Sequence, residues 1–389
     1  MSAPDINKLL SVMKEHDASD LYLTADSAPC YRVKGLVRPA GKRALEMEET
    51  EALARSIMND RQQREFDETN EMNLALNYPA MGRFRVNIFR QRGAIGLVIR
   101  RIITEIPTFE DLSLPSVLKE VAMLKRGLVL VVGATGSGKS TTLASMIDYR
   151  NSNSPGHIVT VEDPIEFIHD HKKSVITQRE IGLDTVSYHF ALKNALRQAP
   201  DVILIGEIRD LETMEAAISF AETGHLCLAT LHSNNANQAM ERVMNFFPVE
   251  RHRQIYLQLS LNLRGVISQR LVRTVDNSRI AAIEILLGSP RVADLIHKGQ
   301  IDEIKEAMEK GSSIGMQTFD MHLFELYREG KITEEEALKN ADSANNLRLK
   351  IKLSEESSET PTPFPKDKTP GRDSAQIREK SSSLLLDEQ

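Results

Sequence analysis

Apolar and polar side chains in the first hundred residues follow helical spacing first and strand-like alternation afterwards. Behind Asp5, a suitable N-cap, apolar residues recur at the spacing of one helix face, at Ile6, Leu9, Leu10 and Met13. Short alternating runs follow at DLYLT, YRVKGLV, GRFRVNIFRQRG and GLVIRRI. In GRFRVNIF, apolar residues alternate with Arg83, Arg85 and Asn87, which predicts a strand with one apolar and one basic face. We therefore expect a small α+β N-terminal domain over residues 1–104.

The pattern changes after a proline-containing stretch. Residues 105–115, within TEIPTFEDLSLP, have the composition of a linker with a hinge. Beyond it, short and nearly continuous apolar strands alternate with segments of helical period, at LVLVV, HIVTVED, VILIGE and LCLATL. Such strands are typical of a parallel sheet covered by helices on both faces. The sequence therefore predicts an α/β domain after the linker.

Helical patterns return after residue 288, in VADLIHKG, IDEIKEAMEKG and FDMHLFELYREGKITEEEAL, with glycines where helix C-caps are expected. We expect these helices to pack on the α/β domain, which then spans residues 116–350. Residues 351–389 are rich in Ser, Pro, Lys and Glu and predict a disordered polar tail. The closing LLLDEQ is either a docking motif or a frayed end, and the frayed end is favoured.

Length, charge and cysteine content narrow the class of protein. A chain of 389 residues favours two domains, and its formal net charge of -6 gives no support for nucleic-acid binding. Cys30 and Cys227 lie far apart beside apolar residues, so we expect two buried thiols rather than a disulfide or a thiolate metal site. The chain starts without a basic and then apolar signal, and no segment is long enough to span a bilayer. We expect a cytoplasmic protein with no transmembrane segment.

The segment GATGSGKST matches the phosphate-binding loop G-x-x-x-x-G-K-[ST], directly after an apolar strand and before a helical segment. Glycines let successive backbone N–H groups face a phosphate at the start of the helix. We expect Lys139 to reach the β- and γ-phosphates and Ser140 to ligate Mg²⁺. The alternative, a chance glycine-rich turn, is disfavoured by the two flanks. The sequence thus predicts an ATP site with Mg²⁺, formed by Gly133, Ala134, Thr135, Gly136, Ser137, Gly138, Lys139, Ser140 and Thr141.

Acidic residues end two of the predicted strands. Glu207 follows VILIG, in the place of a Walker B carboxylate, and we expect it to polarise the attacking water. Glu162 and Asp163 end IVTVED, where they are expected to complete the Mg²⁺ shell with Ser140. For each carboxylate the alternative is a solvated strand end.

A histidine follows a third strand. His232 comes after LCLATL, at the carboxyl edge where open α/β sheets bind ligands, and is expected to sense the γ-phosphate. Its alternative is a purely structural hydrogen bond. His225 opens the same strand, so we expect it at the opposite edge with a structural role.

Four segments together resemble the motifs of secretion-type ATPases. They are GATGSGKSTTLASMID for the Walker A motif, VTVEDPIEFIH for the Asp box, LRQAPDVILIGEIRDLET for the atypical Walker B motif and TGHLCLATLHSNNA for the His box. Within these ATPases, the chain is similar to the type IV pilus retraction ATPases, the PilT and PilU group, up to about residue 350. The resemblance implies a PAS-like N-terminal domain, a RecA-like ATPase domain and a ring of six subunits. It also implies catalytic or metal-orienting roles for Glu162 and Glu207 and a nucleotide contact for His232.

The resemblance further implies that basic residues of the N-terminal domain face the nucleotide. Arg83, Arg85 and Arg100 are the candidates for stabilising transition-state charge. An ordinary solvated strand face is the alternative for each of them.

Two departures bear on the branch of the family. The chain has no paired-CxxC module and no longer N-terminal region, which favours retraction over extension. RVADLIHKGQ stands where PilT-like proteins carry a motif close to AIRNLIRE, and this favours a PilU-like accessory retraction ATPase. The implied partners are a PilT-like paralogue and an inner-membrane platform protein at the cytoplasmic base of a pilus. The alternatives are a non-hydrolysing, nucleotide-gated adaptor of a PilT ring, a pilus extension or secretion ATPase, and a nucleic-acid translocase.

Overall fold

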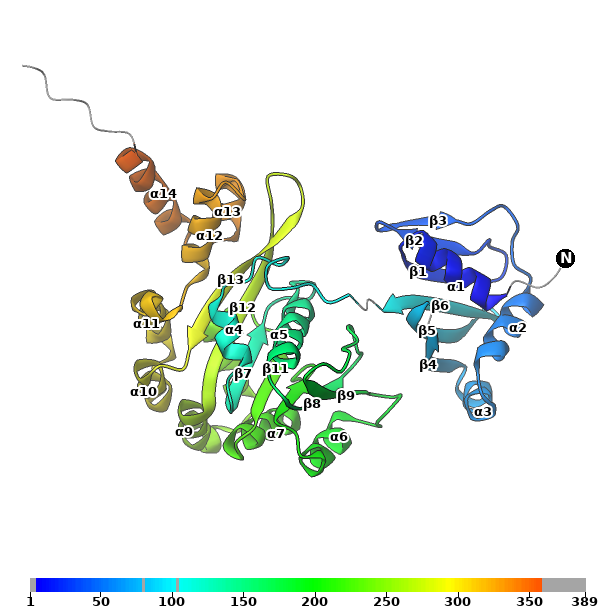
Figure 1. Cartoon of the computed structure of the whole chain (residues 1–389), viewed down its shortest axis with the longest axis horizontal. Coiled ribbons are helices and arrows are strands. Elements are labelled where there is room, and N and C mark those ends of the chain that lie inside the picture. The colour runs from blue at the N-terminus through cyan, green and yellow to red at the C-terminus, as the bar shows by residue number, and fades with distance from the viewer. Residues whose placement is uncertain (1–4, 79–80, 103–104, 359–389) are drawn as a thin grey trace, which may run out of the picture.

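The computed structural model describes residues 5–78, 81–102 and 105–358, which form two domains (Figure 1). The N-terminal domain contains one antiparallel sheet of six strands in the order β3-β2-β1-β6-β5-β4. Its elements are α1 (Ile6–Glu15), β1 (Ala18–Leu23), β2 (Cys30–Val33), β3 (Leu36–Pro39), α2 (Met47–Ile57), α3 (Asp60–Thr69), β4 (Glu71–Tyr78), β5 (Gly82–Gln91) and β6 (Ala94–Ile102).

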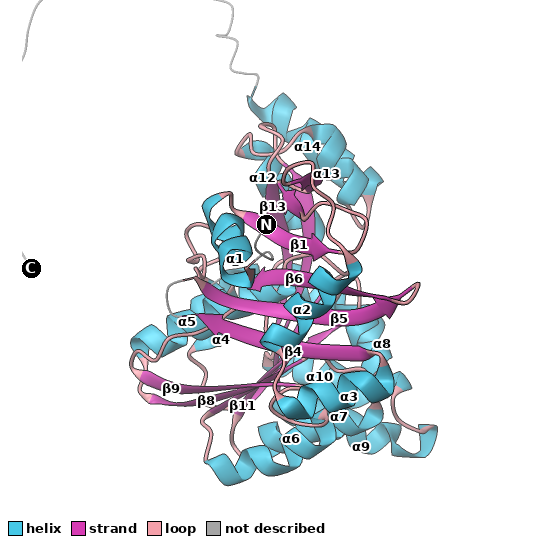
Figure 2. Ribbon diagram, turned by 90° about the vertical axis from the view of Figure 1, so that its right-hand side faces the viewer, coloured by secondary structure: helices cyan, strands magenta, loops and turns pink. Residues whose placement is uncertain are grey.

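The N-terminal domain, which faces the viewer in Figure 2, has its own apolar core, shared by the helices and one face of the sheet. Asp5 caps α1 by accepting a hydrogen bond from the Asn7 backbone N–H at 3.0 Å. Along β5, Phe84, Val86 and Ile88 are fully buried while the residues between them are half-buried. This confirms the strand with one apolar and one basic face.

The C-terminal domain is built on a seven-stranded sheet of order β13-β12-β7-β11-β10-β8-β9. Its first elements are α4 (Val117–Ala122), β7 (Gly127–Val132), α5 (Lys139–Asn153), β8 (Gly156–Glu162), β9 (Ser174–Glu180), α6 (Tyr188–Ala195), β10 (Val202–Ile205), α7 (Leu211–Glu222), β11 (Leu226–Leu231), α8 (Ala236–Asn245) and α9 (His252–Asn262). Then come β12 (Leu263–Arg273), β13 (Arg279–Leu287), α10 (Pro290–Lys298), α11 (Ile304–Lys310), α12 (Phe319–Arg328), α13 (Glu334–Asn340) and α14 (Ala344–Ser358). Short 3-10 turns lie at Leu196–Gln198, Val249–Arg251, Ile301–Glu303 and Ser312–Ile314.

Six neighbouring strands of this sheet, β12 to β9, are parallel, and only β13 pairs antiparallel, with β12. The four apolar runs predicted as strands form β7, β8, β10 and β11. Because parallel strands end at one edge, the segments after these four strands gather there. That edge carries the phosphate-binding loop and the strand-end residues Glu162, Glu207 and His232.

Successive residues of β7 point into two different cores. Leu128 and Leu130 pack with α7, α8 and α10, whereas Val129 and Val131 pack with α4 and α5. The sheet is therefore covered by helices on both faces, as predicted, and the expected fold class of an α/β chain with an α+β N-terminal domain and C-terminal helices is confirmed.

Both ends of the C-terminal domain differ in detail from the boundaries expected above. In the expected linker 105–115, Phe109 and Leu114 are 4% and 9% exposed and belong to the core beside β7. Helix α14 continues to Ser358, so the first residues of the expected tail are helical, and Ile351 is 1% exposed against β12, β13 and α12. Residues 359–389, including LLLDEQ, lie outside the described residues.

The two cysteines differ in their burial. Cys227 is fully buried on β11, but Cys30 is only half-buried, and the prediction of a buried thiol there is wrong. Cys30 lies on β2 in a hairpin whose outer strand β3 is exposed. Its Sγ donates to the Ala28 carbonyl oxygen at 3.2 Å and lies 3.9 Å from Ser27 Oγ, so both partners are local. Among the described helices, none combines the length and apolar character that crossing a membrane requires.

Candidate nucleotide-binding site

The loop between β7 and α5 closes so tightly that two of its glycines, Gly133 and Gly138, have no free space for a side chain. A Cβ on Gly133 would lie 2.4 Å from Ser137 Oγ and 2.5 Å from the Gln269 carbonyl oxygen. Gly138, the residue before α5, has φ of 90° and would bring a Cβ to 2.8 Å from Gln269 Nε2. Helix α5 begins directly after it, at Lys139, so its free N–H groups face the edge of the sheet.

Lys139 is 9% exposed and lies inside the loop. Its Nζ donates to the carbonyl oxygens of Gly133 at 2.9 Å and Ala134 at 3.0 Å. Burial lowers the pKa of Lys139, and the carboxylates of Glu207 and Glu166 oppose this shift. The ammonium is thus a concentrated positive charge at the mouth of a glycine loop, which suits an anionic ligand.

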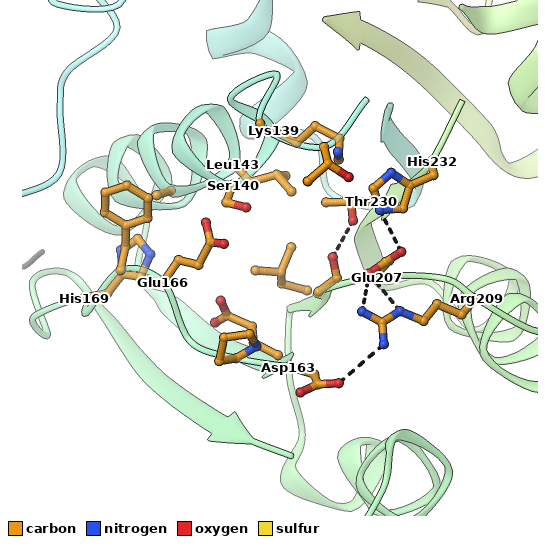
Figure 3. A pocket seen from close by; sticks show the side chains of 18 residues that line it. Lys139, Ser140, Leu143, Asp163, Glu166, His169, Glu207, Arg209, Thr230 and His232 are labelled. Atoms are coloured by element: carbon orange, nitrogen blue, oxygen red, sulfur yellow. Dashed lines mark hydrogen bonds and ion pairs between the residues drawn. The ribbon is translucent and has the colours of Figure 1, made fainter. Parts of the chain in front are cut away.

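A cavity of about 350 Å³ lies beside the loop at the carboxyl edge of the sheet (Figure 3). Its lining comes from the loop and α5, from the segments after β8, β10 and β11, and from the strands themselves. The lining residues are Thr135, Gly136, Lys139, Ser140, Leu143, Ala144, Glu162, Asp163, Pro164, Glu166, Phe167, His169, Leu204, Gly206, Glu207, Arg209, Thr230 and His232.

Both carboxylate oxygens of Glu207 are engaged in this cavity (Figure 3). Its Oε1 lies 2.9 Å from His232 Nε2. Its Oε2 accepts hydrogen bonds from Arg209 Nε at 2.8 Å and Nη2 at 2.7 Å. Arg209 Nη1 also lies 3.6 Å from Asp163 Oδ2. The residues after β8, β10 and β11 therefore form one connected polar network.

Glu162 occupies the buried side of the same cavity. Its Oε1 accepts hydrogen bonds from Thr160 Oγ1 at 2.7 Å and Gln178 Nε2 at 3.3 Å. Burial raises the pKa of Glu162 to about 7, although these two hydrogen bonds favour the ionised form. A carboxyl group with such a pKa can exchange a proton at neutral pH, which is the property of a general acid or base.

The residues present fit a magnesium nucleotide. Ser137 Oγ is buried without a hydrogen-bond partner among the described residues, beside loop N–H groups that a phosphate can use. Ser140, Glu162 and Asp163 offer the hard oxygen atoms that Mg²⁺ prefers. Within the described ranges no group of three or more His, Cys, Asp or Glu residues forms a complete metal cage. Mg²⁺ commonly binds through few protein oxygens together with substrate phosphates, so this donor set is the expected one.

The predicted loop residues divide between the cavity and its surroundings. Thr135, Gly136, Lys139 and Ser140 line the cavity, whereas Gly133 and Ala134 contribute the carbonyl oxygens that hold Lys139. Gly138 and Thr141 face a second hollow on the far side of the loop, together with Gln269. In that region Gln269 Oε1 accepts a hydrogen bond from Thr142 Oγ1 at 2.8 Å and ties α5 to β12.

None of the three predicted arginines lines this cavity. Arg100 lies opposite Asp20 across β6 and β1 and binds its Oδ1 at 2.7 Å, with 65% of its side chain exposed. In this chain a partner on its own sheet holds Arg100, and its contact with a nucleotide stays a prediction. Arg83 and Arg85 instead contact the C-terminal domain, where each lies 3.6 Å from the carboxylate of Glu180.

Arg209, Glu166 and His169 also line the cavity and were not predicted. Arg209 could have been predicted from the sequence, because a charged residue two positions after Glu207 remains near the strand end. His169 is 8% exposed, and burial lowers its pKa to about 4, so its ring is neutral at neutral pH. By contrast, His225 lies at the other edge of the sheet, with Nδ1 3.0 Å from Thr223 Oγ1.

Comparisons with known proteins agree with this geometry. The family model described as Type II/IV secretion system protein matches residues 2–357. The chain is 55% identical to the type IV pilus ATPase PilU of Pseudomonas aeruginosa, over 91% of this chain and 93% of that protein. It is 44% identical to the type IV pilus retraction ATPase PilT of the same organism, over 88% of this chain and 100% of that protein.

Solved structures give the same result. A crystal structure of the pilus retraction motor PilT with bound ADP matches with a TM-score of 0.83 at 39% identity, covering 89% of this chain and 99% of that chain. The Legionella pneumophila ATPase DotB matches with a TM-score of 0.70 at 30% identity, covering 85% of this chain and 94% of that chain. The chain therefore belongs to the Type II/IV secretion system protein family, within its group of PilU-like and PilT-like pilus ATPases.

Proposed function

We propose that this protein hydrolyses ATP to power type IV pilus retraction and that it does so as an accessory motor of the PilU type. The observation that carries the ATPase part is the convergence of Lys139, Ser140, Glu162, Glu207 and His232 on one cavity. The PilU part is supported by the identity of 55% to PilU against 44% to PilT.

The chain's own residues divide the work of binding. Backbone N–H groups of the glycine loop and Lys139 bind the phosphates, while Ser140, Glu162 and Asp163 face the metal position. Mg²⁺, when bound, neutralises phosphate charge and orients the terminal phosphate for attack. His232 contacts Glu207 Oε1. A phosphate that contacts His232 can therefore affect the position of Glu207 at the end of β10.

Hydrolysis then requires a carboxylate that orients water. Water attacks the γ-phosphorus, the bond between that phosphorus and the β,γ-bridging oxygen breaks, and ADP leaves with the electron pair. The proton of the attacking water passes to the Glu207 carboxylate, which lies at the end of β10 inside the cavity.

We infer the assembly from the resemblance to pilus retraction ATPases. The protein acts in a ring of six subunits, alone or mixed with a PilT-like paralogue, in the cytoplasm at the inner-membrane base of the pilus. There its domain motions act on a membrane platform protein. The support for this placement is the similarity to pilus ATPases along 88% or more of the chain.

The test is phosphate release by the purified protein with MgATP, alone and with a purified PilT-like partner. We expect Glu207→Gln to reduce turnover by about 10²- to 10⁴-fold, because an ordered general base contributes about that much. Glu241→Gln, the same exchange at an exposed position of α8, is the matched control and should leave turnover unchanged. Activity only with the partner supports the accessory role, whereas absence of Glu207-dependent turnover under both conditions favours the non-hydrolysing adaptor.

A further inference from the structure

Glu180, the last residue of β9, joins the two domains through charge. Its Oε2 lies 3.6 Å from Arg83 Nη2, and its Oε1 lies 3.6 Å from Arg85 Nε. Both arginines belong to β5 in the N-terminal domain, on the face opposite its apolar core. In Figure 1, β8 and β9 lie on the side of the C-terminal domain that is turned toward the N-terminal domain.

This contact is buried but incompletely satisfied. The Glu180 side chain is 6% exposed, and those of Arg83 and Arg85 are 22% and 26% exposed. Arg83 Nε and Glu180 Oε2 have no hydrogen-bond partner among the described residues. At 3.6 Å each guanidinium group attracts the Glu180 carboxylate by charge without forming a hydrogen bond of normal length. Desolvated guanidinium groups in this condition bind better to an acceptor with more oxygens and more charge.

ATP bound in the cavity would place such an acceptor, its phosphates, close to the strand next to β9. In the parallel pairing of β8 and β9, Glu180 lies directly beside Glu162, which lines the cavity. Adjacent strands in a sheet are about 4.8 Å apart, so Glu180, which pairs with both arginines, lies one strand away from the cavity wall. Glu180 also forms a hydrogen bond with the backbone of Ile165. The residues on either side of Ile165, Pro164 and Glu166, line the cavity.

We propose that Glu180 is a positioning residue, the resting counter-ion of Arg83 and Arg85, and that the phosphates of bound ATP compete with it for these two arginines. Glu180 then holds the N-terminal domain beside the site before nucleotide binds. Transfer of the arginines to the phosphates couples binding to a movement between domains. The inference rests on the proposed function for its nucleotide, but not on hydrolysis.

The test is the Kd of a fluorescent MgATP analogue, measured in a Glu207→Gln background so that binding is followed without turnover. Glu180→Gln keeps the size of the side chain and removes its charge. We expect the Kd to fall by about three- to tenfold, the range for losing one competing ion pair. Asp17→Asn is the matched control, because Asp17 pairs with Arg101 within the N-terminal domain and its side chain is 86% exposed; its Kd should not change.

A double-mutant cycle separates competition from general loosening of the fold. In a chain that also carries Arg83→Gln and Arg85→Gln, Glu180→Gln should no longer change the Kd. An unchanged or higher Kd in the Glu180→Gln protein overturns the proposal, and so does a tightening that persists without the arginines. Glu180→Ala, which should act in the same direction, covers the case in which Glu180→Gln does not fold. A protein that binds MgATP but never hydrolyses it contradicts the proposed function and leaves this inference open to the same binding test.

Discussion

At the scale of single residues, the cavity concentrates acidic groups around one lysine. Glu162, Asp163, Glu166 and Glu207 all line it, together with Lys139. Glu207 has Arg209 and His232, whereas Glu162 has a raised pKa. The remaining negative charge is suited to a divalent cation bound with the nucleotide.

A buried histidine outside the cavity should make the stability of the protein depend on pH. His322 on α12 is 8% exposed, and its Nδ1 accepts a hydrogen bond from the Ile283 N–H at 2.9 Å. Burial lowers the pKa of His322 from 6.5 to about 4. Between these pH values the unfolded chain binds a proton that the folded chain does not, so stability is full above pH 6.5 and falls as the pH drops toward 4.

We expect His322→Asn to weaken this pH dependence, because Asn offers an acceptor near the same position and does not titrate. The rise in unfolding free energy from pH 4 to pH 6.5 should become smaller by about 1–3 kcal/mol. Urea denaturation at a series of pH values measures it, with exposed His16→Asn as the control. Identical slopes in the variant and the wild type would contradict the prediction. His169, whose pKa burial also lowers to about 4, keeps part of the slope in both proteins.

The predicted site residues outside the glycine loop share one property, which is their place at the end of an apolar strand. Glu162, Glu207 and His232 were found in this way, since a parallel sheet brings strand ends to one edge. Arg100 could not be placed, because its partner Asp20 is set by the pairing of β1 with β6, which are far apart in sequence.

At the scale of secondary structure, the strands predicted in the C-terminal sheet are those with nearly continuous apolar side chains. β9, β12 and β13 were not predicted, and β12 shows why: Ser268 and Gln269 interrupt its apolar pattern, yet they are 0% and 3% exposed. Their partners lie far away in the chain, since Ser268 donates to Glu284 and Gln269 accepts from Thr142. Buried polar side chains whose hydrogen-bond partners lie on other elements leave no signal in local periodicity.

Helix α14 allows a matched comparison of its two faces. Leu347 and Ile351 are each 1% exposed and pack with Phe319 and Val272, whereas Leu349 and Leu353 are 60% and 57% exposed. We expect Leu347→Ala or Ile351→Ala to lower the free energy of unfolding by about 2–5 kcal/mol through loss of packing and an unfilled cavity. Leu353→Ala should cost less than about 0.5 kcal/mol. Thermal and chemical denaturation of the three variants provide the measurement, and equal costs on the two faces would refute the packing of α14.

At the scale of the whole molecule, the two domains are built on separate cores. The apolar cluster of the N-terminal domain includes no residue from the C-terminal domain, whose clusters all begin at Phe109 or later. The contacts between the two domains include the ion pairs of Arg83 and Arg85 with Glu180. Charges between domains are more easily separated than a shared apolar core, so this architecture allows the domains to move without unfolding.

This separation predicts that the chain can be divided after residue 104. A fragment of residues 1–104 and a fragment of residues 105–389 should each unfold cooperatively, because Phe109 and Leu114 stay with the second fragment. The second fragment keeps the glycine loop and should bind MgATP, but without Arg83 and Arg85 its turnover should fall at least about tenfold. Circular dichroism melting and phosphate release check the two parts. A first fragment with no cooperative transition would show that the N-terminal domain needs its neighbour to fold, and undiminished turnover in the second would remove the two arginines from the reaction.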